Sequence, residues 1–267
     1  MNAPRSIPSD WFVCPVSKEP LAAAGGELIS RHGRYRMNTE SGYWDFMPTA
    51  PGLIEHSEWE TWQELQDNGV VSYEADPEHN LGVGKRRDFL DFAEFCDFRG
   101  NVLDVGVGPQ RCPTHVEYCE RKDVFFVGLD PLVGVQPRCF SFVRGLGEYL
   151  PFRNGLFDQV LFVTSLDHFI DARAPLLEAK RTLRKSGDIC IWIGEKDKTA
   201  PRPAVVNEWY EKLRVPQGAD DRFHFKRYTS RQFEGYLGDA GLAIVDRRSM
   251  QVDAWRSNLF YRVRPAR

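Results

Sequence analysis

The stretch Asn101-Val-Leu-Asp-Val-Gly-Val-Gly108 decides the fold expected for this 267-residue chain. An apolar strand leads directly into two glycines, and glycine lets a backbone turn approach a ligand closely. We expect a helix after Pro109 or Pro113, whose N-terminus brings free N–H groups and a partial positive charge to that turn. The stretch predicts a strand, a turn and a helix around an anionic or carboxylate-bearing ligand, although a lone Gly-x-Gly pair is more often only a tight turn.

A second apolar strand, residues 124–129, supports the ligand interpretation because it ends in Asp130. This acid follows Asp104 by 26 positions, near the spacing of about 20 at which a ribose-binding acid is expected. A carboxylate there can accept charge-assisted hydrogen bonds from both ribose hydroxyls. The structural alternative is an aspartate that only caps the next turn.

Short apolar runs alternate with helix-period segments after residue 100, which is typical of a parallel sheet wound with helices. A helix over Thr229–Ala240, ended by Gly241, precedes two β-rich runs that would close the sheet as an antiparallel hairpin. The strands expected, in chain order, are 101–105, 124–129, 140–143, 157–163, 188–194, 242–250 and 258–264.

Five linked segments, in one order, resemble the class I S-adenosylmethionine (SAM)-dependent methyltransferases, in particular the ubiquinone-biosynthesis type (type 11) branch. They are VLDVGVGPQ (102–110), GLDPL (128–132) and residues 144–169, 176–195 and 228–245, so the resemblance covers about residues 80–265. It implies an α/β fold with a Rossmann-like seven-stranded methyltransferase sheet, helices on both faces, and SAM as cofactor.

The resemblance also implies a SAM pocket built from ten residues. Two departures from the family pattern, Gln110 in place of a third glycine and Leu146 in place of an acid, bear on affinity more than on fold. The ten are Asp104, Gly106 and Gly108 at the methionine part, Asp130 and Pro131 at the ribose, Leu146, Gly147 and Glu148 at the adenine, and Thr164 and Ser165 near the methyl group.

Catalysis by such a site requires alignment of the acceptor and, for a hydroxyl, removal of its proton. His168, after the strand 157–163, is the candidate base, and Asp167 would orient its imidazole. The structural alternative is that His168 only packs under the sheet edge or caps a helix. Glu195 and His224 are secondary candidates. No metal site is expected.

The chain divides into three parts by composition. Residues 1–50 form a β-rich module, residues 51–79 a helical linker, and residues 80–267 the methyltransferase domain, which begins with a helix ending before Gly100. The long segment 196–227 is expected to be a substrate cap.

The module at residues 1–50 resembles a zinc ribbon that has lost its metal. Zinc requires four ligands, yet Cys14-Pro-Val-Ser17 keeps one cysteine of the first pair, and the second pair offers only Ile29, Ser30 and His32 near the expected positions. We expect aromatic residues to hold the module together instead: Trp11, Phe12, Tyr35, Trp44 and Phe46.

Composition narrows the function. A net charge of −3 and a pI near 6.1 argue against a nucleic-acid partner. With neither a signal-like start nor an apolar run long enough to span a membrane, the chain is expected to be cytoplasmic, and its six scattered cysteines are expected to be thiols.

We therefore expect methyl transfer to a small-molecule or glycan-type hydroxyl. An RNA base methyltransferase, or a non-catalytic partner subunit with the same fold, are the alternatives.

Overall fold

The computed structural model describes most of the chain. Residues 51–54 and 77–79 of the expected linker, and residues 80–85 of the expected first domain helix, lie outside the described residues. The described ranges are 4–48, 55–76, 86–117, 119, 123–135, 137–197, 199–200 and 208–266.

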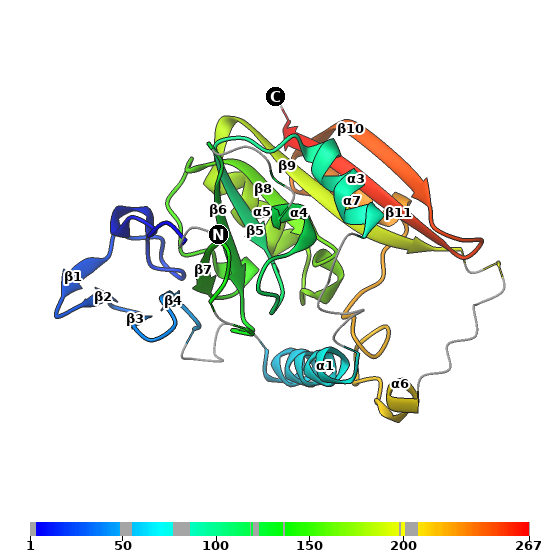
Figure 1. Ribbon diagram of the computed structural model, residues 1–267, viewed down its shortest axis with the longest axis horizontal. Helices are drawn as coiled ribbons and strands as arrows, with labels where there is room; N and C mark the ends of the chain where they lie inside the picture. The colour runs from blue at the N-terminus through cyan, green and yellow to red at the C-terminus, as the bar shows by residue number, and fades with distance from the viewer. Residues whose placement is uncertain are drawn as a thin grey trace.

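The described strands form one mixed sheet in the order β1-β2-β3-β4-β7-β6-β5-β8-β9-β11-β10 (Figure 1). The central strands from β4 to β9 pair in parallel, and the hairpin of β10 and β11 adds to β9 antiparallel. This arrangement confirms the α/β fold. The strands after residue 100 are β5 (Asn101–Val105), β6 (Phe125–Asp130), β7 (Ser141–Arg144), β8 (Phe157–Val163), β9 (Leu183–Lys196), β10 (Leu242–Gln251) and β11 (Arg256–Pro265).

The sheet is larger than the seven strands predicted for the methyltransferase part, because four strands of the N-terminal module extend it. They are β1 (Ala22–Ala24), β2 (Glu27–Ser30), β3 (Gly33–Asn38) and β4 (Tyr43–Asp45). β7 would otherwise leave unpaired backbone N–H and C=O groups at the edge of the sheet, and β4 pairs with them in parallel. An ion pair of 2.9 Å between Arg144 Nη1 and Asp45 Oδ2 joins the two strands further.

Helices cover both faces of the sheet, as predicted. Along β9, Ile189, Ile191 and Ile193 belong to one hydrophobic cluster with α5 and α7, whereas Cys190 and Trp192 belong to another with α3. Because side chains alternate along a strand, these clusters lie on opposite faces. The described helices are α1 (His56–Ala75), α3 (Arg87–Cys96), α4 (Thr114–Glu117), α5 (Arg173–Thr182), α6 (Glu208–Lys212) and α7 (Ser230–Asp239), with 3₁₀ turns η1 (Ser9–Trp11), η3 (Gly147–Tyr149) and η4 (Leu166–His168).

Four of the five aromatic residues predicted to hold the N-terminal module pack together, namely Phe12, Tyr35, Trp44 and Phe46, whereas Trp11 packs on Phe125 and Phe157. The Phe12 ring lies 4.8 Å from that of Phe46 and stacks on that of Phe152 at 5.7 Å, measured between ring centroids. Since Phe152 lies in the part predicted to be the methyltransferase domain, the module shares the main hydrophobic core of the sheet.

One pair of cysteines contradicts the expectation of free thiols. Cys112 and Cys139 form a disulfide, although 27 positions separate them. The loops after β5 and before β7 lie side by side, as the hydrogen bond from Cys139 N to the Arg111 carbonyl (3.0 Å) shows. The two cysteines are distant in sequence but close in space, so their pairing could not be predicted from their spacing. Cys14, Cys96 and Cys190 are buried free thiols.

No described helix combines the length and the apolar character needed to cross a membrane.

Candidate functional site

A cavity lies where the central parallel strands end. Turns after β5, β6 and β8 line it, which is where ligands bind in open parallel sheets. Ten of the twelve residues predicted for the site line this cavity: Gly106, Gly108, Asp130, Pro131, Leu146, Gly147, Glu148, Thr164, Ser165 and His168. Asp104 and Asp167 lie immediately behind it, each next to a histidine that does line it.

The glycine turn after β5 is required by its backbone geometry. Gly106 and Gly108 both have a φ of +78°, which side chains other than glycine rarely adopt. A Cβ on Gly106 would lie 2.5 Å from the Cβ of Ser165, whose hydroxyl donates to the Val105 carbonyl (2.7 Å). The turn is therefore packed tightly against the end of β8. The predicted helix follows Pro113 as α4.

Asp130 joins the second strand to the glycine turn. Its Oδ2 accepts from Gly108 N and its Oδ1 from Leu132 N, each at 2.8 Å. Burial raises the pKa of Asp130 to about 6 even though these hydrogen bonds oppose the shift. Each oxygen keeps a lone pair, so the turn-capping role and the ribose-binding role are compatible in one carboxylate.

Asp104 forms a buried pair with His115, which sequence reasoning missed. His115 Nε2 lies 2.7 Å from Asp104 Oδ2, and both side chains are 2% exposed. Asp104 Oδ1 and His115 Nδ1 have no hydrogen-bond partner among the described residues. Buried polar atoms are normally paired, so these two are available to a polar ligand group. The position of His115 just after Pro113, at the start of the expected helix, was the available signal.

The loop before η3 closes the cavity at the end predicted for adenine. A Cβ on Gly147 would lie 2.5 Å from the Phe169 ring, so only glycine fits there. Burial raises the pKa of Glu148 to about 7. This side chain is thus a hydrogen-bonding group that changes its protonation near neutral pH.

The opposite end of the cavity follows β8 and carries the candidate base. Thr164 has a φ of +55°, an uncommon backbone conformation for a β-branched residue. The turn it starts brings His168 into the cavity wall at the end of η4.

The expected hydrogen bond between Asp167 and His168 is not formed. Asp167 Oδ1 lies 3.8 Å from His168 Nε2, because Asp167 is held from its other side by Arg227 Nη1, 2.8 Å from Oδ2. The His168 ring is instead hydrogen-bonded by the backbone of Phe223. Burial of Asp167 would raise its pKa, but His224, His168 and Arg227 lower it below the ordinary value.

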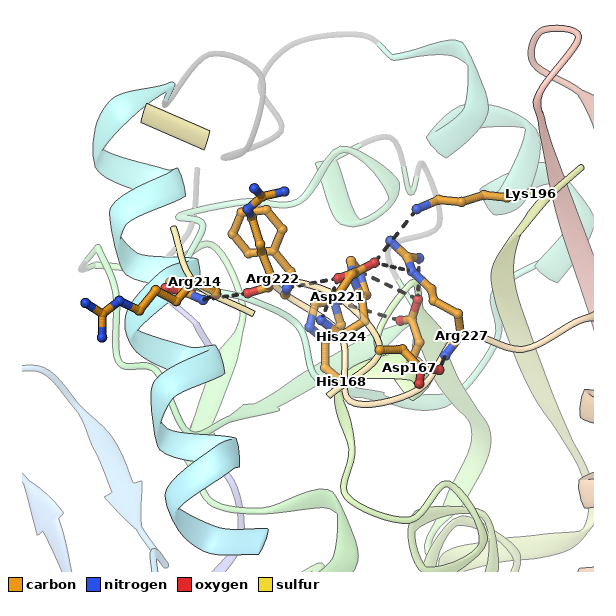
Figure 2. A network of polar contacts seen from close by, with 11 residues as sticks. Asp167, His168, Lys196, Arg214, Asp221, Arg222, His224 and Arg227 are labelled. Carbon is orange, nitrogen blue, oxygen red and sulfur yellow. Dashed lines mark hydrogen bonds and ion pairs between the residues drawn. The ribbon is translucent and has the colours of Figure 1, made fainter. Parts of the chain in front are cut away.

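His224 joins the same network, with Asp221 as its main partner (Figure 2). His224 Nδ1 lies 2.6 Å from Asp221 Oδ1, and the His224 and His168 rings lie 4.4 Å apart between centroids. Burial, followed by the charge of His224, lowers the pKa of His168 to about 4. His168 therefore stays neutral at physiological pH.

The secondary candidate Glu195 lies away from this network. It accepts a hydrogen bond from Ser230 N (2.7 Å) at the start of α7 and does not line the cavity.

The atoms of Asp167, His168 and His224 that could bind a metal lie within 4.8 Å of one another. Arg227 already supplies a positive charge to the same carboxylate at 2.8 Å. A metal ion would have to bind beside this guanidinium, so we interpret the cluster as a hydrogen-bonded and ionic network.

The segment expected to be a linker forms a wall of the site. Trp62, Gln66 and Tyr73, all on α1, line the cavity. Figure 1 shows α1, in cyan, below the sheet with α6 beside it. Sequence reasoning missed this role because helical spacing shows that a helix forms but not which element it covers.

α1 is fastened to the segment expected to be the cap. Asn68 Nδ2 donates to the carbonyls of Arg214 (3.0 Å) and Arg222 (2.7 Å), and Thr61 Oγ1 donates to that of Gln217 (2.7 Å). The helix and residues 208–228 thus form a joint cover. Residues 198 and 201–207 of the expected cap lie outside the described residues.

Comparison with known proteins defines the class of this site. Residues 103–191 match the family model described as a methyltransferase domain. These residues therefore belong to a methyltransferase domain, a class of enzyme domain whose cofactor is SAM.

Particular relatives are distant. The chain is 27% identical over 116 residues to the uncharacterized protein YafE of Escherichia coli K12, a match that covers 42% of this chain and about half, 53%, of that protein. Among solved structures, the 1,6-didemethyltoxoflavin-N1-methyltransferase of Burkholderia thailandensis with bound S-adenosylhomocysteine has a TM-score of 0.58 at 17% identity, covering 90% of this chain and 98% of its own. The [4+2]-cyclase SpnF has a TM-score of 0.53 at 14% identity, covering 77% and 97%. Both structural likenesses concern the fold.

Proposed function

We propose that this chain transfers the methyl group of SAM to a hydroxyl of a small-molecule or glycan-type acceptor. The observation that carries the proposal is that one cavity joins Gly106, Asp130 and Glu148 to His168. The residues for the cofactor and a neutral imidazole for the acceptor thus face the same space. The Burkholderia thailandensis neighbour is a methyltransferase that acts on N1 of 1,6-didemethyltoxoflavin, which supports a small-molecule acceptor; the choice of a hydroxyl rests on His168 alone.

The residues around the cavity fit SAM. The glycine at 106 leaves space that a Cβ would fill, and Asp130 offers two oxygens toward hydroxyls. The unpaired Asp104 Oδ1 and His115 Nδ1 suit the charged amino-acid end of the cofactor, and Glu148 suits the adenine amino group. When bound, SAM supplies a methyl group already activated by its sulfonium.

The protein then has to align the acceptor hydroxyl with the methyl group and to accept the proton of that hydroxyl. His168, neutral because burial and His224 lower its pKa to about 4, can accept the hydroxyl proton while the C–O bond forms. Asp167, 3.8 Å from His168 Nε2, stabilises the imidazolium that results. α1 and residues 208–228 cover the acceptor and exclude water.

Two finer assignments remain proposals of ours: the ubiquinone-biosynthesis branch and the descent of the N-terminal module from a zinc ribbon. The second is supported by the groups around Cys14. Ser30 Oγ lies 3.3 Å and Ser17 N 3.5 Å from Cys14 Sγ, so residues at former ligand positions gather around one remaining cysteine.

The experiment is a calorimetric titration with SAM, followed by transfer of labelled methyl from SAM to a panel of phenols, catechols and hexosides, with bulk RNA as a further acceptor. We expect SAM binding and label on a hydroxyl. Binding without transfer to any hydroxyl, with label on RNA bases, would favour the RNA alternative. No binding would favour a non-catalytic subunit.

A further inference from the structure

Two imidazoles pack against each other at the acceptor end of the cavity (Figure 2). His168, on η4, lines the cavity; His224, from the loop before α7, packs against its ring at 4.4 Å between centroids with a tilt of 44°. His168 therefore lies between the acceptor space and His224.

The two rings have unequal partners. His224 has a carboxylate at each end, with Asp221 Oδ1 2.6 Å from Nδ1 and Asp167 Oδ2 3.7 Å from Nε2. Among the described residues, His168 pairs with one carboxylate, that of Asp167 at 3.8 Å, in addition to its hydrogen bond with the Phe223 backbone. A positive charge is consequently stabilised more at His224 than at His168.

Asp221 is itself firmly positioned. Its Oδ1 accepts from the backbone N–H groups of Phe223 (2.9 Å) and His224 (3.0 Å), and its Oδ2 from Arg227 Nε (2.9 Å). Lys196 Nζ lies 3.8 Å from Oδ2. The pair of Asp221 and His224 thus has the geometry of a carboxylate that orients an imidazole.

We propose that His168 and His224 act as one unit that holds a single proton: His168 receives it at the cavity, and it comes to rest on His224 between Asp221 and Asp167. This inference rests on the proposed hydroxyl methylation. Asp221 is a positioning residue.

The step balances without any other reactant. The acceptor oxygen forms a bond to the methyl carbon, the bond from that carbon to sulfur breaks, and the hydroxyl proton moves to His168. It then passes to His224, and His168 returns to its neutral form, while the Asp167 carboxylate faces both Nε2 atoms, stays ionised and stabilises the charge on either ring. The two contacts of 3.7 and 3.8 Å must shorten to hydrogen bonds for this transfer, as catalytic contacts often do on binding.

The charges facing His168 agree with this order. His224 and Arg227 disfavour a charge on His168, whereas Asp167 favours it, and Asp221 and Lys196 lie one step further away. Burial and these neighbours together lower the pKa of His168 to about 4, so His168 passes on a proton more readily than it retains one.

The test is an NMR pH titration of the histidine rings in the full chain saturated with S-adenosylhomocysteine. The signals are assigned with His168→Asn and His224→Asn variants. As the pH is lowered, we expect the first proton to enter the pair on the His224 ring, with His168 still neutral. His224→Asn should then raise the titration midpoint of His168 by roughly one pH unit or more.

Asp221→Asn, which keeps the ring but removes its carboxylate, should raise the same midpoint by less. His32→Asn, in the exposed turn of the N-terminal module, is the matched control and should leave it unchanged. Near-UV circular dichroism shows whether Asp221→Asn and His224→Asn are folded. If one of them unfolds, the other variant tests the proposal.

Protonation of His168 before His224, or an unchanged His168 midpoint in the folded variants, would overturn the proposal. Failure of the proposed function is observed separately, because no hydroxyl acceptor would then receive the labelled methyl group, while the coupling of the two rings could still be measured.

Discussion

Replacing Asp130 by Asn tests the ribose end of the site. The wild-type carboxylate accepts two backbone N–H groups at 2.8 Å and faces the cavity. An amide offers one oxygen and one NH₂ group, so it loses the charged acceptor. Hydrogen bonds to charged groups contribute about 1.5 to 3 kcal/mol each, so loss of one should weaken SAM binding about 10- to 150-fold.

The assay is calorimetric titration of SAM at pH 7.5, with Asp246→Asn, an exposed aspartate on β10, as the matched control. One backbone N–H would face the new NH₂ group in Asp130→Asn, which costs about 1 to 3 kcal/mol of stability, so folding is checked by thermal denaturation. An affinity within threefold of wild type in the folded variant would refute the role of Asp130.

The same residue predicts a pH dependence. Burial raises the pKa of Asp130 to about 6, so its carboxylate gains a proton as the pH falls through that value. SAM affinity should fall below about pH 6 in the wild type. Glu148, with a pKa raised to about 7, titrates in the same cavity, so the comparison is made in a Glu148→Gln background. The Asp130→Asn variant should lack the step near pH 6.

Three further changes have defined outcomes. Gly106→Ala forces a side chain into a φ of +78° and within 2.5 Å of Ser165, which should cost about 2 to 5 kcal/mol in a denaturant melt; a loss below about 1 kcal/mol would contradict the tight turn. Cys112→Ser removes the disulfide to Cys139, which joins residues 27 positions apart, and should lower the free energy of unfolding by about 3 kcal/mol. A reductant should lower the Tm of the wild type but not that of the variant. His168→Asn should lower transfer to a hydroxyl acceptor by about 10² to 10⁴-fold with little change in SAM affinity, and unchanged turnover would remove it from the mechanism.

The central sheet and most of the cavity could be predicted because their signals are local. Buried parallel strands are short apolar runs, and ligand residues follow directly where those strands end, as Gly106, Asp130 and Ser165 do. Ten of the predicted residues therefore line one cavity.

Other features depend on contacts between distant segments, which leave little trace in a sequence. The pairing of Trp44 with Val143 that extends the sheet is of this kind, and so is the disulfide of Cys112 and Cys139. The pairing of His224 with Asp221 is local in sequence, three positions apart. Its meaning appears only when the loop before α7 packs against η4.

The most direct test of the account is a crystal structure of the full chain with S-adenosylhomocysteine. The account predicts the ribose hydroxyls on Asp130, the adenine beside Glu148, and the sulfur facing the space in front of His168. Adenosine bound elsewhere, or a cavity whose acceptor end opens away from His168, would contradict it.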